Sequence, residues 1–260
     1  MKFKNIVLIS TKGGVGKTTI GWHLMPYFLK DREFELIEID NNNKTVKTFS
    51  SSSLLENRMS SFDISAGTEK LEEVVINNMM DDTKINVIDS GGGDDTKAVL
   101  NMIEKLKMTD ETLFVIPFMP DYAQIENLID TYKLVHNYQF IVLVNNINLK
   151  DDDDMLFVNG DADLEIPDFR KMFKNKFYII PKSKYFSIAA AKYKETLYDF
   201  AKIAFEMDQK TAINLVKEQT DGNRDAMLAM LRKHKEADNA KDYLESHEVA
   251  ELKNFFDKAV

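Results

Sequence analysis

Residues 11–19 have the composition and spacing of a loop that holds phosphate. They read Thr-Lys-Gly-Gly-Val-Gly-Lys-Thr-Thr, after an apolar run and before a helical pattern. Strand, glycine-rich loop and helix are the context that such a loop needs. Glycines let backbone N–H groups approach phosphate oxygens, and the helix N-terminus adds partial positive charge. We therefore predict that the nucleotide-binding residues are Gly13, Gly14, Val15, Gly16, Lys17, Thr18 and Thr19.

Three positions of this loop differ in the chemistry they allow. Lys17 can reach the β- and γ-phosphates of a nucleotide, and the Thr18 hydroxyl can bind Mg²⁺. The ordinary pattern G-x-x-x-x-G-K-[ST] has glycine where this chain has Thr11, and a second lysine, Lys12, stands before the double glycine. The stretch K-G-G-V-G-K-T-T resembles the deviant phosphate-binding loop of the ParA/MinD family of ATPases.

The resemblance gives Lys12 a specific expected role. In the ParA/MinD family this lysine reaches the nucleotide of the other subunit in an ATP-bound dimer and neutralises charge on its phosphates. The resemblance therefore implies that ATP joins two protomers with two-fold symmetry. It also implies that Lys12 and Lys17 are catalytic, with Lys12 acting in trans like an arginine finger. ATP and Mg²⁺ are the cofactors that it implies.

Apolar runs alternate with helical patterns, which predicts an α/β fold of parallel strands joined by crossover helices. We expect a doubly wound, mostly parallel sheet of the P-loop NTPase type. The expected strands are 3–10, 34–40, 85–89, 112–117, 139–145 and 177–181. The expected helices are 18–30, 68–79, 95–107, 122–136 and 189–207, with Pro26 as a possible kink in the first.

Three other segments complete the expected organisation. The ATPase domain is expected to span residues 1–207. The polar stretch 41–53, with its run of serines, is predicted to be a mobile loop. The acidic, poorly periodic stretch of about 146–168 is predicted to be an insertion. Residues 208–260 are charged and helix-forming, so we expect an appended C-terminal helical segment there.

Two predicted strands end in aspartate. Asp89 ends strand 85–89, and the carboxyl end of such a strand lies beside the phosphate loop in a doubly wound sheet. Asp89 is therefore predicted to join Thr18 at the metal, through water. Asp40 ends strand 34–40, and the resemblance places an aspartate here near the attacking water. The following residues, Asn41–Asn43, depart from the family's usual Asp-Pro-Gln. We predict that Asp40 orients water for phosphoryl transfer.

The resemblance also implies an adenine site. The family often has asparagine at the end of the strand that corresponds to 139–145. We therefore expect Asn145, with Asn146 as the second candidate, to hydrogen-bond the base. Ile180-Pro181 resembles the family's Ile-Pro stretch, whose backbone packs around adenine, so Pro181 is included in the nucleotide site. No guanine-type Asn-Lys-x-Asp motif occurs on this strand.

Composition restricts the class of protein. The chain has 260 residues, a net charge of −9 and no cysteine. The charge argues against a protein that coats nucleic acid over its whole surface. The lack of cysteine excludes metal-binding relatives such as the nitrogenase iron protein, iron–sulfur scaffold ATPases and zinc-bridged targeting ATPases. No apolar window reaches about 18 residues, and no signal peptide precedes the first strand. We expect a cytoplasmic protein without stable membrane insertion.

The stretch 169–194 is basic, rich in aromatic residues and free of acids. Such a stretch can contact the phosphates of DNA without reading its sequence. Together with this stretch, the resemblance implies a ParA-like ATPase of DNA (plasmid) partition, nucleoid-associated and with slow hydrolysis that a partner such as a centromere-binding protein stimulates. The expected DNA contacts are Arg170, Lys171, Lys174, Lys176, Lys182 and Lys184.

Other outputs of the same ATPase remain open. A MinD-like membrane-positioning ATPase would use an amphipathic C-terminal helix, and Leu252, Phe255 and Phe256 form an apolar stripe there. An accessory ATPase of plasmid conjugation would keep the nucleotide chemistry and change the partner. A metabolic ATP-dependent ligase is less favoured because such enzymes usually lack the lysine at position 12. A switch without hydrolysis is less favoured because Lys17, Thr18 and Asp89 are intact.

Overall fold

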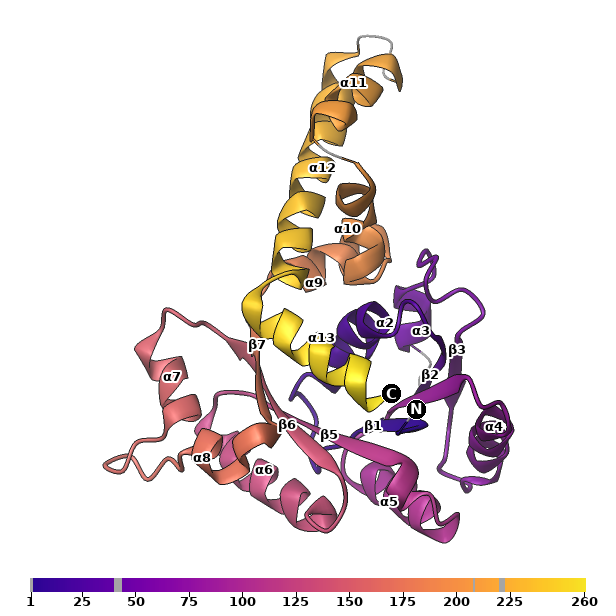
Figure 1. Cartoon of the computed structure of the whole chain (residues 1–260), viewed down its shortest axis with the longest axis vertical. Helices are drawn as coiled ribbons and strands as arrows, with labels where there is room; N and C mark the ends of the chain where they lie inside the picture. Colours follow the sequence, from indigo (N-terminus) through magenta and orange to yellow (C-terminus); the bar gives the residue numbers. More distant parts are fainter. Residues whose placement is uncertain (1, 40–43, 208, 220–222) are drawn as a thin grey trace.

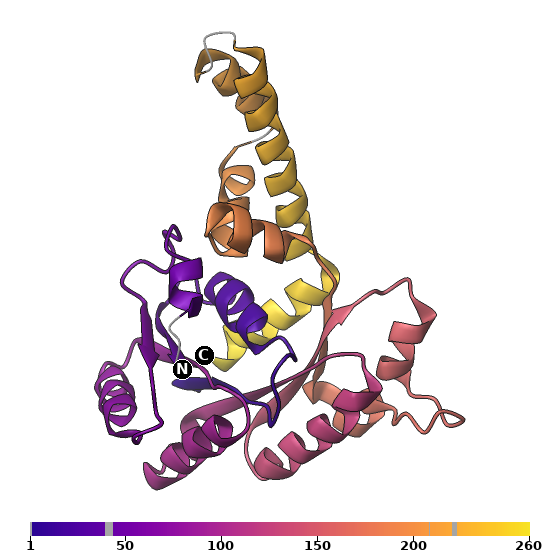
Figure 2. The same ribbon diagram turned by 180° about the vertical axis from the view of Figure 1, so that it is seen from behind.

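The computed structural model describes residues 2–39, 44–207, 209–219 and 223–260 (Figure 1). These residues form one sheet of seven strands, ordered β3-β2-β4-β1-β5-β6-β7, in which every neighbouring pair is parallel. Helices cover both faces of the sheet (Figures 1 and 2). The predicted doubly wound, parallel α/β fold is confirmed. The strands are β1 Asn5–Leu8, β2 Glu33–Ile39, β3 Met59–Phe62, β4 Lys84–Asp89, β5 Thr112–Phe118, β6 Phe140–Ile147 and β7 Phe177–Pro181.

The central strands are continuous apolar runs because both of their faces are buried. Every residue of β1 and β5 is buried. The sequence prediction missed β3, whose four residues Met-Ser-Ser-Phe are only half-buried at one edge of the sheet. Its two serines interrupt the apolar run by which the other strands are recognised. The opposite edge is β7, which is also half-buried over most of its length.

Two hydrophobic cores lie on the two faces of the sheet. The helices of the first are the π-helix Ile20–Leu24, α2 Met25–Phe28, α3 Lys44–Thr48, α9 Tyr185–Ile188, the π-helix Ala189–Tyr193, α10 Leu197–Glu206, α12 Arg224–Leu244 and α13 His247–Ala259. The helices of the second are α4 Glu69–Met80, α5 Asp94–Lys105, α6 Tyr122–Val135, α7 Asp152–Asn159 and α8 Phe169–Phe173. Helices α1 Lys17–Thr19 and α11 Gln209–Gln219 complete the helices of the described chain, apart from two 3₁₀ turns, Thr109–Glu111 and Lys174–Lys176.

Two predicted helices are interrupted. The helix expected over 18–30 contains a π-helical segment, Ile20–Leu24, just before Pro26 in the first turn of α2. Proline lacks the N–H that an α-helical bond to the preceding turn would need, so the widened turn lies where that bond is missing. The helix expected over 189–207 stops at Lys194, whose φ is 57°. Helix α10 then starts anew, and the Thr196 hydroxyl accepts from the Asp199 N–H at 3.0 Å.

The prediction of a mobile loop over 41–53 is wrong for its described part. Residues 44–48 form α3, and the serine run that follows is tied to α10. Ser53 Oγ donates to Asp199 Oδ1 at 2.8 Å, and the Leu54 N–H donates to the same oxygen at 3.1 Å. Ser52 donates to the other carboxylate oxygen. One aspartate distant in sequence therefore holds the loop. Residues 41–43 lie outside the described residues.

The acidic stretch 146–168 is more ordered than its sequence suggests. The Asp151 carboxylate accepts from the Asp153 N–H at 3.1 Å, and α7 begins at the next residue after Asp151. Phe157 and Val158 on this helix are buried in the second core. Consecutive aspartates hid the helix because they interrupt the apolar period, although they favour a helix N-terminus.

The last helix, α13, shares a core with the first strand. Leu252 and Phe256 are fully buried, and the Phe256 ring stacks on Phe28 at 5.3 Å between centroids. The Phe3 N–H donates to the Ala259 carbonyl at 3.1 Å. Most of the apolar stripe of the C-terminal helix is thus buried against its own domain. Helices α11 and α12 extend away from the sheet as a hairpin (Figures 1 and 2). Within the described chain, no helix has the length and apolar character to cross a membrane.

Candidate functional site

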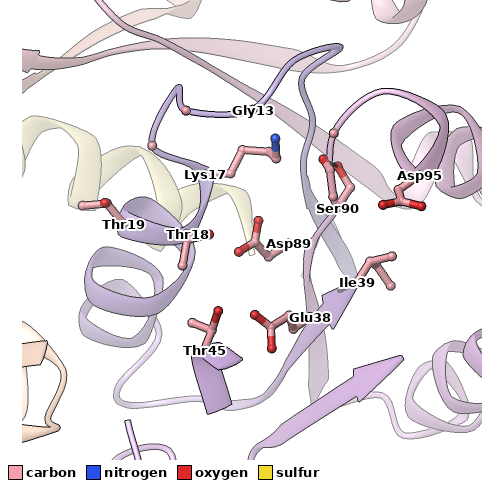
Figure 3. Close-up of a pocket in the computed structure, with 14 residues that line it drawn as sticks. Gly13, Lys17, Thr18, Thr19, Glu38, Ile39, Thr45, Asp89, Ser90 and Asp95 are labelled. Atoms are coloured by element: carbon pink, nitrogen blue, oxygen red, sulfur yellow. Dashed lines mark hydrogen bonds between the residues drawn. The ribbon is translucent and has the colours of Figure 1, made fainter. Parts of the chain in front are cut away.

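A cavity of about 520 Å³ lies at the carboxyl ends of β1, β2 and β4. Its walls come from the loop after β1, the end of β2, Thr45 of α3, the end of β4 and the start of α5. Figure 3 shows Lys17, Asp89 and Glu38 around this space, each from a different element. Parallel strands place their carboxyl ends at one edge, which is where ligands of such sheets bind.

The predicted phosphate loop forms one wall of this cavity. Six of its seven predicted residues line the cavity, while the side chain of the seventh, Val15, is buried beneath the loop. Gly14 and Gly16 have φ values of 80° and 93°, a region that other residues rarely adopt. A Cβ on Gly16 would stand 1.9 Å from Asn145 Nδ2, so this position also needs glycine for space. The six lining residues are Gly13, Gly14, Gly16, Lys17, Thr18 and Thr19.

The two lysines of the loop face different surroundings. Lys17 is buried, and its Nζ donates to the Lys12 carbonyl at 3.3 Å. Burial lowers the pKa of Lys17, while the charges of Asp89 and Asp95 act to raise it. The Lys12 side chain is exposed and lies outside the cavity lining. The backbone of Lys12 thus holds Lys17 in place, while its own side chain takes no part in lining the cavity.

Asp89 ends β4 at the predicted position and pairs in register with Leu8 of β1. Burial raises the pKa of Asp89 to about 6, against the lowering effects of the Lys17 charge and a hydrogen bond with Thr18. Trp22 Nε1 also donates to Asp89 Oδ2, at 3.3 Å. The carboxylate is therefore buried within reach of the two loop residues with which sequence analysis grouped it.

Sequence analysis missed two carboxylates that line the cavity, Glu38 and Asp95. Glu38 on β2 is 3% exposed and lines the cavity, where its charge contributes to the raised pKa of Asp89. A signal was available, because Glu38 is the one charged residue in the otherwise apolar run 36–39. A charged group is almost never buried without a function or a partner. The predicted Asp40, two residues later, lies outside the described residues.

The residues around the cavity fit a magnesium ion. Mg²⁺ prefers oxygen ligands, keeps several waters and usually takes one or two carboxylates together with substrate phosphates. The Asp89 carboxylate, the Thr18 hydroxyl and the Glu38 carboxylate provide such oxygens at one cavity. A divalent cation would also stabilise the charged form of Asp89, which burial disfavours. The site thus suits an ion that shares its coordination with a nucleotide.

The predicted adenine contacts do not line this cavity. Asn145 is buried beneath the phosphate loop, where its Nδ2 donates to the Val15 carbonyl at 3.4 Å. Asn146 has a φ of 65° at an irregularity between β6 and β7. The Pro181 carbonyl accepts from the Tyr243 hydroxyl at 2.9 Å. Asn145 thus supports the loop, and a contact of these three residues with the base stays a prediction.

The six predicted DNA contacts lie at the two ends of β7. Four of them, Arg170, Lys171, Lys174 and Lys176, lie in α8 and the turn before β7, whereas Lys182 and Lys184 follow its last residue. The five residues of β7 separate the two groups, a span of roughly 15 Å at about 3.3 Å per residue. Only Lys182 and Lys184 lie at the edge of the sheet where the strands end and the cavity opens. The continuous basic sequence is thus divided between the amino end and the carboxyl end of β7.

We expect the substitution Trp22→Phe to weaken the Mg²⁺-dependent part of ATP affinity by about tenfold. The reason is that groups which orient a metal-binding carboxylate typically contribute this much. Trp22 is fully buried and stacks on Phe49 with 5.2 Å between ring centroids, so phenylalanine keeps the packing and removes the donor to Asp89. Calorimetric titration with ATP, with and without Mg²⁺, measures the effect.

Phe49→Leu is the matched control for Trp22→Phe, because it removes the stacking and leaves the hydrogen bond. An equal loss of Mg²⁺-dependent affinity in both variants would assign the effect to packing. An unchanged Mg²⁺ dependence in Trp22→Phe would remove Trp22 from the site.

Comparison with known proteins agrees with this geometry. Residues 6–153 match the family model described as the CobQ/CobB/MinD/ParA nucleotide binding domain. Apo McdA of Cyanothece is similar at 14% identity, over 73% of this chain and 90% of that chain, with a TM-score of 0.51. The MinD cell division protein of Aquifex aeolicus is similar at 16% identity, over 88% and 96% of the two chains, with a TM-score of 0.50. No curated protein sequence matches.

These structural similarities concern the fold, since both identities are low. The family model covers more than half of the chain and includes the phosphate loop, β2 and Asp89. The resemblance stated from the loop residues is confirmed by a match that extends far beyond them. The chain belongs to the family of CobQ/CobB/MinD/ParA nucleotide-binding domains.

Proposed function

We propose that this protein is a ParA-like ATPase that binds and hydrolyses ATP with Mg²⁺, dimerises in the ATP state and acts in DNA (plasmid) partition. The observation that carries the proposal is that the two lysines of one loop lie in different surroundings. Lys17 and Thr18 line the cavity beside the buried Asp89, whereas the Lys12 side chain is exposed outside it. This difference is expected if Lys17 binds the nucleotide of its own protomer and Lys12 reaches the nucleotide of the partner protomer.

The chemistry proposed for the cavity is phosphoryl transfer to water. Such a reaction depends mainly on positioning and on stabilising charge that spreads over the transferred phosphate. The loop N–H groups and Lys17 would hold the phosphates, and Thr18 and Asp89 would hold Mg²⁺, which neutralises charge on the phosphate oxygens when bound. Asp40 is proposed to orient the attacking water. Glu38 is a second carboxylate at the cavity and is available for the same task.

The proposed dimer explains why hydrolysis would be slow in the single chain. Each protomer would lack the charge of one lysine at its own phosphates until the partner's Lys12 arrived. A partner protein, such as a centromere-binding protein, would stimulate hydrolysis by favouring that arrangement. The protein would be cytoplasmic and associated with the nucleoid while it holds ATP.

DNA binding is proposed to use Lys182 and Lys184. These two exposed lysines are the predicted contacts that lie at the same edge of the sheet as the nucleotide cavity. A dimer that forms across this edge would bring four such lysines onto one side, which favours phosphate contacts over a single protomer's two. Binding by this route would depend on ATP and carry no sequence preference.

The experiment that tests the function measures binding to duplex DNA of arbitrary sequence, with MgATP and with ADP. We expect binding only with MgATP, and a loss of about 100-fold in affinity between 50 and 200 mM salt, since about four phosphate contacts release counterions. Lys182→Gln/Lys184→Gln is expected to weaken binding by at least tenfold. Lys171→Gln/Lys176→Gln, before the amino end of β7, is the matched control. No binding at low salt would exclude DNA as the ligand.

The alternative of a MinD-like membrane-positioning ATPase finds less support in the structure. Leu252 and Phe256, two of the three residues of the proposed amphipathic stripe, are 0% exposed on α13. Membrane binding through them would require the helix to leave the core. An accessory role in conjugation would use the same ATPase cycle, and no feature of the described residues favours it over partition.

A further inference from the structure

The outer edge of β7 opens into a groove. In the described chain β7 pairs only with β6, so its other side carries backbone groups without a neighbouring strand. A groove of about 550 Å³ runs along Phe177, Tyr178 and Ile179 at this edge. Helix α8 and the turn after it form one wall, and the first turns of α13 form the other. The site is separate from the nucleotide cavity, with which it shares no residue.

The two walls of the groove belong to opposite faces of the sheet. Phe177 and Ile179 pack into the core that contains α8, whereas Tyr178 packs into the core that contains α13. The Tyr178 and Phe255 rings, 5.3 Å apart between centroids, mark the α13 side. A chain added along β7 would continue this alternation, because successive side chains of a strand point to opposite faces.

The walls also carry opposite charges. Arg170 and Lys174 line the groove on the α8 side, and Glu248 and Glu251 line it on the α13 side. Among the residues that the structure describes, none of these four takes part in an ion pair within 4 Å. Alternate side chains of a strand in the groove would therefore face the cations of the α8 wall, and the remaining side chains would face the carboxylates of the α13 wall.

We propose that the β7 groove binds an extended peptide segment of a partner protein, in which acidic and basic residues alternate, as an eighth strand of the sheet. Main-chain hydrogen bonds to β7 would provide affinity, and the two walls would select the charge pattern. Acidic side chains of the peptide would face Arg170 and Lys174, and its basic side chains would face Glu248 and Glu251.

Two other occupants fit the groove less well. Duplex DNA would bring phosphates against Glu248 and Glu251 as well as against the cations, and like charges repel. In the second alternative, another copy of the chain would pair its β7 with this one around a two-fold axis. The face of the sheet that carries α8 in one copy would then continue into the same face of the other copy. Arg170 and Lys174 would then lie beside the same two cations of the other copy, and the glutamates beside glutamates. The alternating peptide is the occupant that satisfies both walls.

The test uses the full chain and two fluorescein-labelled octapeptides of equal composition, followed by fluorescence anisotropy at low salt. One peptide alternates glutamate and lysine, and the other has four glutamates followed by four lysines. We expect the alternating peptide to bind at least tenfold more tightly than the block peptide. Hydrogen exchange in the β7 segment should slow at least tenfold when the alternating peptide saturates the protein, as strand addition requires.

Charge reversal gives a sharper test of the two walls. Reversal of one wall, by Arg170→Glu/Lys174→Glu, should lower affinity for the alternating peptide at least tenfold. Reversal of both walls, by adding Glu248→Lys/Glu251→Lys, should restore it, because a shift of the peptide by one residue exchanges its faces. Lys171→Gln, on the same helix but outside the groove lining, should bind the peptide as the unchanged protein does.

Several outcomes would overturn the proposal. Equal binding of the two peptides, or no rescue in the fourfold variant, would show that the walls do not read alternating charge. Duplex DNA binding that is lost in Arg170→Glu/Lys174→Glu, while the peptide fails to compete, would assign the groove to nucleic acid. Self-association of nucleotide-free protein that the same double variant abolishes would assign it to a second copy. ATP turnover and ATP-dependent DNA binding are measured separately, so failure here leaves the proposed function in place.

Discussion

Replacement of Lys12 by alanine is expected to lower ATP turnover by about 10³-fold while ATP affinity changes less than about threefold. The Lys12 side chain is exposed and outside the cavity, so ATP binding in the same chain is not expected to depend on it. The Lys12 carbonyl, which accepts from Lys17 Nζ, survives the substitution because it belongs to the backbone. Steady-state ATPase rates and titration with ATP measure the two quantities on the same preparation.

Size-exclusion chromatography with MgATP separates the role of Lys12 from that of Lys17. The Lys12→Ala variant should bind ATP and remain largely monomeric, because the charge that it would bring to the partner's phosphates is lost. Lys17→Ala is the matched control and should lose ATP binding itself. Unchanged turnover in Lys12→Ala would show that the lysine does not act in trans, even if the cavity binds ATP as proposed.

The substitution Asp89→Asn is expected to stabilise the nucleotide-free protein at neutral pH and to abolish Mg²⁺-dependent ATP binding. Burial raises the pKa of Asp89 to about 6, from its ordinary value of 3.8 in an unfolded chain. Folding therefore opposes loss of the proton. The resulting loss in the free energy of unfolding is absent below pH 3.8, grows as the pH rises from 3.8 to 6 and is complete above pH 6. At 1.36 kcal/mol per pKa unit it amounts to about 3 kcal/mol.

Urea unfolding at two pH values tests the sign as well as the size of this effect. Asparagine does not ionise, so the variant should exceed the unchanged protein in the free energy of unfolding by about 1 kcal/mol at pH 4.5 and about 3 kcal/mol at pH 7.5. Asparagine keeps an oxygen that can accept from Trp22 Nε1. A gain independent of pH, or a loss of stability at pH 7.5, would contradict the raised pKa of Asp89.

The parts of the site that sequence predicted are those encoded by neighbouring residues. The loop follows β1 directly, so its glycines and Lys17 identify a phosphate site without knowledge of the remaining fold. Asp89 was predictable because the end of a buried parallel strand always reaches the same edge of the sheet. Glu38 could have been predicted in the same way, from a charge within a buried strand.

Segments distant along the chain could not be placed by such reasoning. The four serines after α3 have the composition of a mobile loop, but the Asp199 carboxylate of α10 accepts from Ser52 and Ser53, and the Lys194 carbonyl accepts from the Ser51 N–H. Strand β3 forms because β2 offers it an edge, since its own residues are too polar to indicate a strand. In both cases the stabilising partner lies outside the sequence window from which a prediction is made.

The sequence by itself determined the phosphate loop, the parallel α/β architecture and the family, because local spacing and apolar periodicity encode them. The tertiary structure decided which charges share a surface. The basic stretch 169–194 is continuous in sequence, yet β7 carries its parts to opposite ends of the strand. Arg170 and Lys174 lie across a groove from Glu248 and Glu251 instead, since α13 returns from the end of the chain to pack beside β7. An extended strand thus separates basic residues that are close in sequence, and helix packing brings together charged residues that are distant in sequence.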